Sequence, residues 1–195
     1  SSTSEQAFQN PSSPQSKALQ WIATVDTTPV DDPFASQRFS LATIYYSIIS
    51  KSDQAWTFLS RQASSDADGG TTNGHWLDAH VGYCDWKGVT CSNRRWLDDT
   101  PNNNGPVLAL NLSSSELEGS IPPELSLLTD MEVLDLSTNK LGNDDSILQE
   151  TTLQPLSKLK SLQLQHNKFM TTIPPNLLSI FPALEVLDIS GNALK

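Results

Sequence analysis

The chain has 195 residues, a formal net charge of −10 and 37% hydrophobic residues. This length suits one domain, and the acidic balance argues against binding to nucleic acid or anionic lipid, which attract clustered Lys and Arg. No apolar run approaches the roughly 18 residues of a membrane span, so we expect membrane attachment only through a segment outside this sequence. The first 16 residues lack the block pattern of a signal peptide, which indicates a mature or trimmed form.

The N-terminal third reads as a tail followed by helices. Residues 1–13 are rich in Ser, Gln, Asn and Pro, and are predicted to form a flexible or draped tail. Ser13 and Pro14 then suit the cap and first turn of a short helix. After a break, Asp32 caps a second predicted helix over residues 34–50, whose two apolar stripes indicate that it is covered on two sides.

Residues 53–75 combine a predicted helix or turn around Trp56 with a surface loop of turn-forming residues. The loop briefly resembles a calcium-binding loop. However, Leu77 stands where, counting from Asp66, a bidentate glutamate is needed. We therefore expect no metal and no cofactor here.

The chain has two cysteines, and both lie in the segment GYCDWKGVTC at residues 82–91. Cys84 and Cys91 are either one disulfide or two reduced thiols. A zinc site that adds His75 and His80 fits no common ligand spacing. A bridge here would indicate an oxidising compartment: the cell surface, a secreted fluid or an organelle lumen.

From residue 107 the sequence becomes periodic. Units begin at Val107, Met131, Leu159 and Leu184, and each opens with the pattern L-x-x-L-x-L-x-x-N-x-L or a close variant. Such a period predicts a solenoid of three full units and one partial unit over residues 107–195. In each unit the L-x-L pair predicts a short strand with both leucines inward, and stacked strands would form a parallel sheet.

Two other positions of the repeat have clear structural meaning. The Asn slot holds Ser115, Asn139, Asn167 and Asn192, whose side chains are expected to bond backbone groups at the bend, Ser115 more weakly than the amides. The second unit is longer than the others, which predicts a bulging loop between Asn143 and Thr152. The fourth unit ends early, so we expect its edge to be covered by more repeats or by a partner.

These residues resemble a known family. VLALNLSSSELEGSIP is similar to the plant-type leucine-rich repeat, and CDWKGVTC resembles the C-x-W-x-G-V-x-C element of the N-terminal cap in receptor ectodomains. The upstream segments QRFSLATIYYSI, DQAW and HWL are closest to the caps of algal members. The resemblance covers about residues 14–195.

The resemblance implies a fold of the α/β class: a right-handed leucine-rich repeat solenoid with a short parallel concave sheet. It places a helical N-terminal cap region at residues 14–106 and implies that a Cys84–Cys91 disulfide pins it. It further implies that Trp76 and Trp86 pack over the first leucine layer and that Gly88 allows a tight turn. Such a cap shields the apolar end of the solenoid.

The outward positions of the predicted strands are the candidate binding surface, because receptor and inhibitor members of the family bind peptides or proteins there. The candidates are Asn111, Ser113, Asp135, Ser137, Gln163, Gln165, Asp188 and Ser190, with His166 just beyond. Asn111 also opens an N-x-S sequon, so it is a candidate for glycosylation, which would cover this face.

The sequence shows no nucleotide-binding, metalloprotease or hydrolase motif, and we expect no enzyme. The function predicted first is a non-enzymatic interaction module that recognises a protein, a peptide or a glycan at a surface or lumenal site, on its concave face or the 143–152 loop. The alternative is a permanent structural subunit of a larger assembly.

Overall fold

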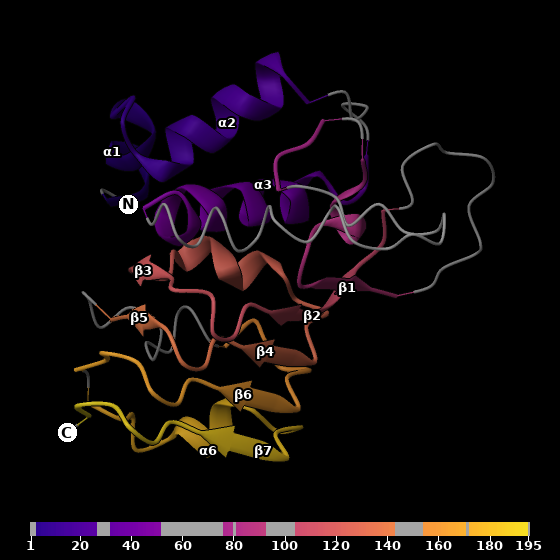
Figure 1. Cartoon of the computed structure of the whole chain (residues 1–195). Coiled ribbons are helices and arrows are strands. Elements are labelled where there is room, and N and C mark those ends of the chain that lie inside the picture. The colour runs from indigo at the N-terminus through magenta and orange to yellow at the C-terminus, as the bar shows by residue number, and fades with distance from the viewer. Residues whose placement is uncertain are drawn as a thin grey trace, which may run out of the picture.

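The computed structural model describes residues 3–26, 32–51, 76–79, 81–92, 104–142, 154–170 and 172–194. Helices from the first part of the chain lie at one end, and the repeats stack below them in chain order towards the C-terminus (Figure 1). Among the described residues, no helix has the length and apolarity that crossing a membrane requires. The predicted segment around Trp56 and the bulge between Asn143 and Thr152 lie outside the described residues.

Three α-helices and one π-helical turn make up the described N-terminal helices. Their bounds are α1 Thr3–Gln9, α2 Pro14–Thr24, α3 Ala35–Ile44 and η1 Tyr45–Ile49. Helix α2 begins as predicted, because the Ser13 hydroxyl accepts the Ser16 N–H at 3.1 Å. Helix α3 begins at Ala35, and the Asp32 carboxylate accepts the Phe34 N–H at 2.8 Å just before it.

Two features of this part add to the expected elements. The segment expected to be a flexible or draped tail contains helix α1, where the Phe8 ring stacks on Phe39 of α3 at 6.2 Å between centroids. The helix expected over residues 34–50 is α-helical to Ile44 and then widens to a π-helix. Helix α3 is covered by α2 on one side and by the 3-10 helix η4 (Pro123–Leu127) on another, which explains its apolar stripes.

One sheet of five strands forms the spine of the repeats. Its order is β1-β2-β4-β6-β7, with β1 antiparallel to β2 and all later pairs parallel. The bounds are β1 Val89–Cys91, β2 Val107–Asn111, β4 Val133–Asp135, β6 Ser161–Gln163 and β7 Val186–Asp188. A second sheet pairs β3 (Glu118–Gly119) with β5 (Lys140–Leu141) on the other side of the coil (Figure 1).

The predicted leucine pattern builds the core. Each of the four parallel strands directs one leucine inward, and the register aligns Leu110, Leu134, Leu162 and Leu187 into one row. The first three of these are buried, and Leu187 is half-buried in the last unit. Short helical turns close the units: η3 Tyr83–Asp85 in the cap, η4, and α6 Leu177–Ile180. The predicted right-handed solenoid with a disulfide-pinned cap is therefore the fold of this chain.

The asparagine slot forms a ladder inside the bend. Asn139 Oδ1 accepts the N–H groups of Ser115 and Leu117, both at 3.0 Å, so one amide serves the preceding unit. Asn167 and Asn192 repeat one of these two bonds in the following units, accepting the Leu141 and Phe169 N–H groups at 3.0 and 3.1 Å. The Ser115 hydroxyl bonds only the Ser113 carbonyl, at 3.0 Å, among the described residues, in line with the weaker role predicted for it.

Candidate functional site

The cysteine segment ties the cap to the first strand. Cys84 and Cys91 form a disulfide with a sequence separation of seven residues, which decides between the two states that the sequence allows. Cys84 lies in the turn η3, and Cys91 ends β1, which pairs with β2. The bridge therefore holds an edge strand of the concave sheet against the cap. Among the described residues, no group of His, Cys, Asp or Glu is placed to hold a metal ion.

Tryptophans form the centre of the cap. Trp76 and Trp86 are buried, with ring centroids 5.3 Å apart, and Trp21 of α2 contacts Trp86 edge to face at 5.9 Å. The Trp76 indole N–H donates to the Lys87 carbonyl at 2.9 Å. These rings join helix α2 to the disulfide segment, so the cap is one packed unit above the first leucines.

Arg38 is a buried cap residue that was not among the sequence-based candidates. Its side chain is 1% exposed, and its Nε atom donates to Asp26 at 2.6 Å in an ion pair that is buried on both sides. The guanidinium lies over the rings of both Trp21 and Trp86, at 5.1 and 5.4 Å from their centroids. No sequence signal marks this contact, because the tryptophans lie in other segments and meet Arg38 only in the folded cap.

Gly88 explains how the chain turns into the first strand. Its φ of +83° lies in the left-handed region, and a Cβ atom there would stand 2.2 Å from the Asn111 carbonyl oxygen. The backbone can come so close only because glycine lacks that atom. This close contact of the two backbones forms a hydrogen bond, in which the Gly88 carbonyl oxygen accepts the Asn111 N–H at 2.8 Å.

Tyr83 closes the cap on its other side. Its hydroxyl donates to the Gly105 carbonyl at 2.6 Å inside the protein. Burial, followed by the nearby Asp32 charge, raises the pKa of Tyr83 far above its ordinary value. The hydroxyl therefore keeps its proton and acts as a structural donor.

The concave face consists of aligned outward side chains from four parallel strands. Register places them in columns: first Ala109, Val133, Ser161 and Val186, and second Asn111, Asp135, Gln163 and Asp188. Backbone bonds continue the alignment to a third column of Ser113, Ser137, Gln165 and Ser190. The structure thus aligns the eight candidates in two columns, but one of them, Ser137, is buried and adds no exposed side chain to the face. His166 follows at its border, exposed and with φ of +57°.

The second and third columns are linked by short hydrogen bonds. Asp135 Oδ1 accepts the Ser137 N–H at 3.0 Å, and Asp188 Oδ1 accepts both the N–H and the hydroxyl of Ser190, at 3.0 and 2.7 Å. These bonds, together with the charge of His166, lower the pKa of Asp188 below its ordinary value. Asp188 is therefore a fixed carboxylate near neutral pH.

Two further candidates of this face differ in exposure. Asn111 is exposed, and its Oδ1 atom accepts the N–H and hydroxyl of Ser113 at 3.2 and 3.0 Å. Gln165 Oε1 is enclosed and accepts no hydrogen bond from the described residues. Val186 is an exposed apolar residue here, with 49% of its surface accessible.

Positive charge lies beside this face and is already paired. Lys158 contacts Asp130 at 2.5 Å, and Lys160 contacts Glu132 at 2.7 Å. Both ion pairs link neighbouring units just before their strands begin. The three columns themselves contain no Lys or Arg, so the face is polar and acidic.

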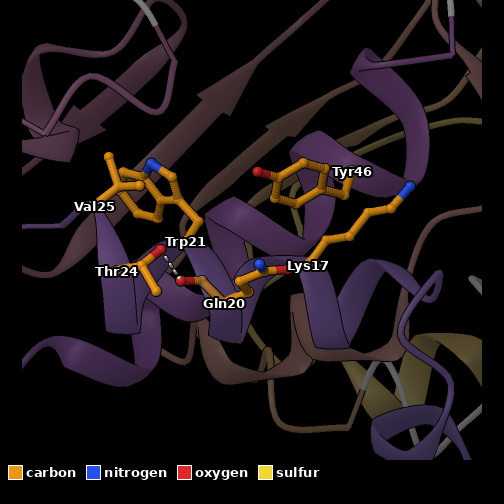
Figure 2. A pocket seen from close by; sticks show the side chains of 6 residues that line it. All are labelled: Lys17, Gln20, Trp21, Thr24, Val25 and Tyr46. Atoms are coloured by element: carbon orange, nitrogen blue, oxygen red, sulfur yellow. Dashed lines mark hydrogen bonds between the residues drawn. The ribbon is translucent and has the colours of Figure 1, made fainter.

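A shallow pocket of about 200 Å³ lies on the cap between α2 and η1 (Figure 2). Its lining consists of Lys17, Gln20, Trp21, Thr24, Val25 and Tyr46. Small-molecule sites generally range from about 300 to 1,000 Å³ and enclose their ligand. The Thr24 hydroxyl is moreover used locally, since it donates to the Gln20 carbonyl at 2.7 Å. The concave face is therefore the stronger candidate.

Comparisons with known proteins agree with this architecture. Residues 146–194 match the family model described as Leucine rich repeat. Protein MALE DISCOVERER 1 from Arabidopsis thaliana is 32% identical over 118 residues, which are 60% of this chain and 15% of that protein. The chain spans between 6% and 15% of the length of the first curated relatives that it matches.

Solved structures show the same fold. The Arabidopsis receptor kinase HAESA, in complex with the peptide hormone IDA and the co-receptor SERK1, is 30% identical with a TM-score of 0.50, covering 73% of this chain and 22% of that chain. The structure of PEPR1-AtPEP1 is 27% identical with a TM-score of 0.52, covering 80% and 18%. Residues 146–194 therefore match leucine-rich repeats, and the chain as a whole is similar to leucine-rich repeat ectodomains of plant receptors. The predicted closeness to algal members stays a prediction.

Proposed function

We propose that this chain is a non-enzymatic recognition module that binds a protein or peptide segment across its concave sheet. The observation that carries the proposal is the sheet itself: four strands in parallel register present aligned outward side chains, and the asparagine ladder and leucine rows hold their backbone in place. A rigid platform of this kind lowers the ordering cost of binding. The likeness to ectodomains solved with a peptide hormone supports the same use.

The proposal is tested by selecting binders from a random peptide library displayed on phage. Two variants with the same charge change serve as matched probes. Gln163→Arg places a long side chain in the centre of the face, whereas Met170→Arg changes a residue that is 61% exposed outside the sheet. We expect selected peptides to lose binding to Gln163→Arg and to keep it for Met170→Arg. Failure to select any binder, or binders that ignore Gln163→Arg, would contradict the proposal.

We infer that the chain works in an oxidising compartment, at the cell surface or in a lumen. The Cys84–Cys91 disulfide supports this, because such bridges persist where thiols are not kept reduced. Glycosylation of Asn111 stays a prediction that follows from the same location. Its test is a mass shift on enzymatic deglycosylation of secreted protein.

The alternative, permanent assembly as a structural subunit, stays a prediction of its own. Gentle extraction from the source, followed by sizing and mass spectrometry of co-migrating chains, separates the two. A free species near 21.3 kDa supports recognition of a transient partner. Migration in fixed ratio with a large complex supports the subunit.

A further inference from the structure

The concave face has two chemically different columns side by side. One column is largely aliphatic and includes Val133 and the exposed Val186. The next carries Asp135, Gln163 and Asp188 on successive strands. Since residues of one column follow those of the other by two positions along a strand, the columns lie about 6.6 Å apart. A ligand lying between them meets apolar surface on one edge and carboxylates on the other.

The two carboxylates are held in place, and among the described residues no Lys or Arg forms an ion pair with either of them. The charge of His166, at the border of the face, acts on Asp188. Each carboxylate uses Oδ1 to accept a serine N–H two residues later, which fixes the side chain. Within the described residues, the neighbouring lysines Lys158 and Lys160 are paired with acidic residues of the flank, not with Asp135 or Asp188. The face therefore offers two fixed negative charges to an incoming partner, and its field favours a cationic one.

The spacing of these charges fits an extended peptide that crosses the strands. Asp135 and Asp188 are separated by one strand, β6, so their backbones lie about 9.6 Å apart. Alternate side chains of an extended segment point to the same edge at intervals of about 6.6 Å. The flexible stems of Lys or Arg cover the remaining difference. The residue between two such cations points to the opposite edge above β6, where Ser161 lies between Val133 and Val186.

We propose that the concave face binds an extended basic peptide segment that carries Lys or Arg at alternate positions and an aliphatic residue between them. The segment crosses β4, β6 and β7, with its cations against Asp135 and Asp188 and its aliphatic residue above Ser161, between Val133 and Val186. This inference rests on the proposed function and specifies the chemistry of its partner.

The test measures fluorescence anisotropy with an acetylated and amidated Lys-Val-Lys-Val-Lys probe that carries a dye. A Glu-Val-Glu-Val-Glu probe tests the charge, and a Lys-Ser-Lys-Ser-Lys probe tests the aliphatic residue. We expect the first probe to bind best, the acidic probe not to bind, and the affinity to fall as salt rises from low to physiological strength.

Variants locate the interaction. Asp135→Asn/Asp188→Asn removes two charges while each side chain keeps the oxygen that accepts the serine N–H, so folding should be preserved. Asp85→Asn/Glu118→Gln removes two charges from exposed positions in the cap and in the second sheet. We expect the first variant to lose about threefold to fivefold in affinity for each charge removed, and the second to lose less than twofold.

Four results would overturn the inference. If the control variant loses as much affinity as Asp135→Asn/Asp188→Asn, only net charge attracts the probe. If acidic and basic probes bind equally, the carboxylates do not select the partner. If the phage selection gives peptides that need the concave face but lack basic residues, this inference fails while the proposed function stands; a selection that gives no binder of any sequence removes both.

Discussion

Asn139 offers the sharpest test of what holds the repeats together. The substitution Asn139→Ala removes one amide that makes five hydrogen bonds inside the bend. Its oxygen accepts two backbone N–H groups, and its nitrogen donates to the carbonyls of Leu112, Leu136 and Ser137 at 2.9, 3.0 and 3.1 Å. The side chain is buried, so water does not replace these partners easily.

The expected magnitude follows from counting which groups lose every partner. The carbonyls of Leu136 and Ser137 keep other donors, from Asn167 and from the Ser114 N–H. The Ser115 and Leu117 N–H groups and the Leu112 carbonyl keep none among the described residues. Three buried groups at about 1–3 kcal/mol each, with some relaxation, predict a loss of about 3–5 kcal/mol in the free energy of unfolding. For a chain of this size that lowers Tm by about 6–20 °C.

Asn192→Ala is the matched control, because this residue occupies the same slot in the last unit, where it is only half-buried. Asn192→Ala removes the hydrogen bonds of the Phe169 N–H and the Ile189 carbonyl, which lie near solvent. We expect it to lower the free energy of unfolding by about 1–2 kcal/mol. The assays are urea unfolding followed by tryptophan fluorescence and hydrogen exchange of the Ser115 and Leu117 amides. Equal costs for the two variants, or unchanged protection of those amides in Asn139→Ala, would refute the reasoning.

Three further outcomes are expected. Gly88→Ala, at a φ of +83°, should lower the free energy of unfolding by at least about 2 kcal/mol; a circular dichroism melt matching the wild type contradicts this. Replacing Cys84 and Cys91 by serine should cost about 2–3 kcal/mol by loop entropy, measured by urea titration, and no change would mean that the cap is held without the bridge. Ser190→Ala should raise the pKa of Asp188, because that carboxylate loses a hydroxyl donor. A depressed pKa in the folded state stabilises the fold at pH values above the pKa of the unfolded state, and this stabilisation is lost as pH falls. The variant should therefore lose less free energy of unfolding on acidification than the wild type. A carbon NMR titration gives the pKa of Asp188 in both proteins, and identical values contradict the assignment.

The repeat part was predictable because its rules are local. A leucine that recurs with the period of one turn must face the core in every unit, and the register follows once strands stack. The outward residues between those leucines follow by alternation, which is why Asp135, Gln163 and Asp188 were placed on the concave face from sequence alone. Alternation does not predict which charged residues are paired. Lys158 and Lys160, for example, form ion pairs with acidic residues of the neighbouring unit.

The cap was recognisable but its internal contacts were not. The Trp21, Arg38 and Trp86 side chains come from three separate segments, and no sequence period links them. An arginine in a helix is ordinarily read as a solvent-facing residue. Arg38 is buried because the two indoles and the Asp26 carboxylate surround it in the folded cap. Cation–π contacts and buried ion pairs depend on tertiary geometry in this way, whereas hydrophobic rows do not.

The structure also explains why a helical cap can replace a missing repeat. Each repeat receives hydrogen bonds from its neighbour through a strand and an amide side chain. In the cap, β1 is the neighbouring strand. The buried Gln37 of α3 supplies the amide, whose oxygen accepts the Val107 N–H at 2.7 Å. Ser40 of the same helix bonds the Glu124 carbonyl at 2.7 Å. The polar residues of α3 thus bond backbone groups of the first unit, as the asparagine ladder bonds those of the later units. The concave sheet is therefore held in place from its first strand.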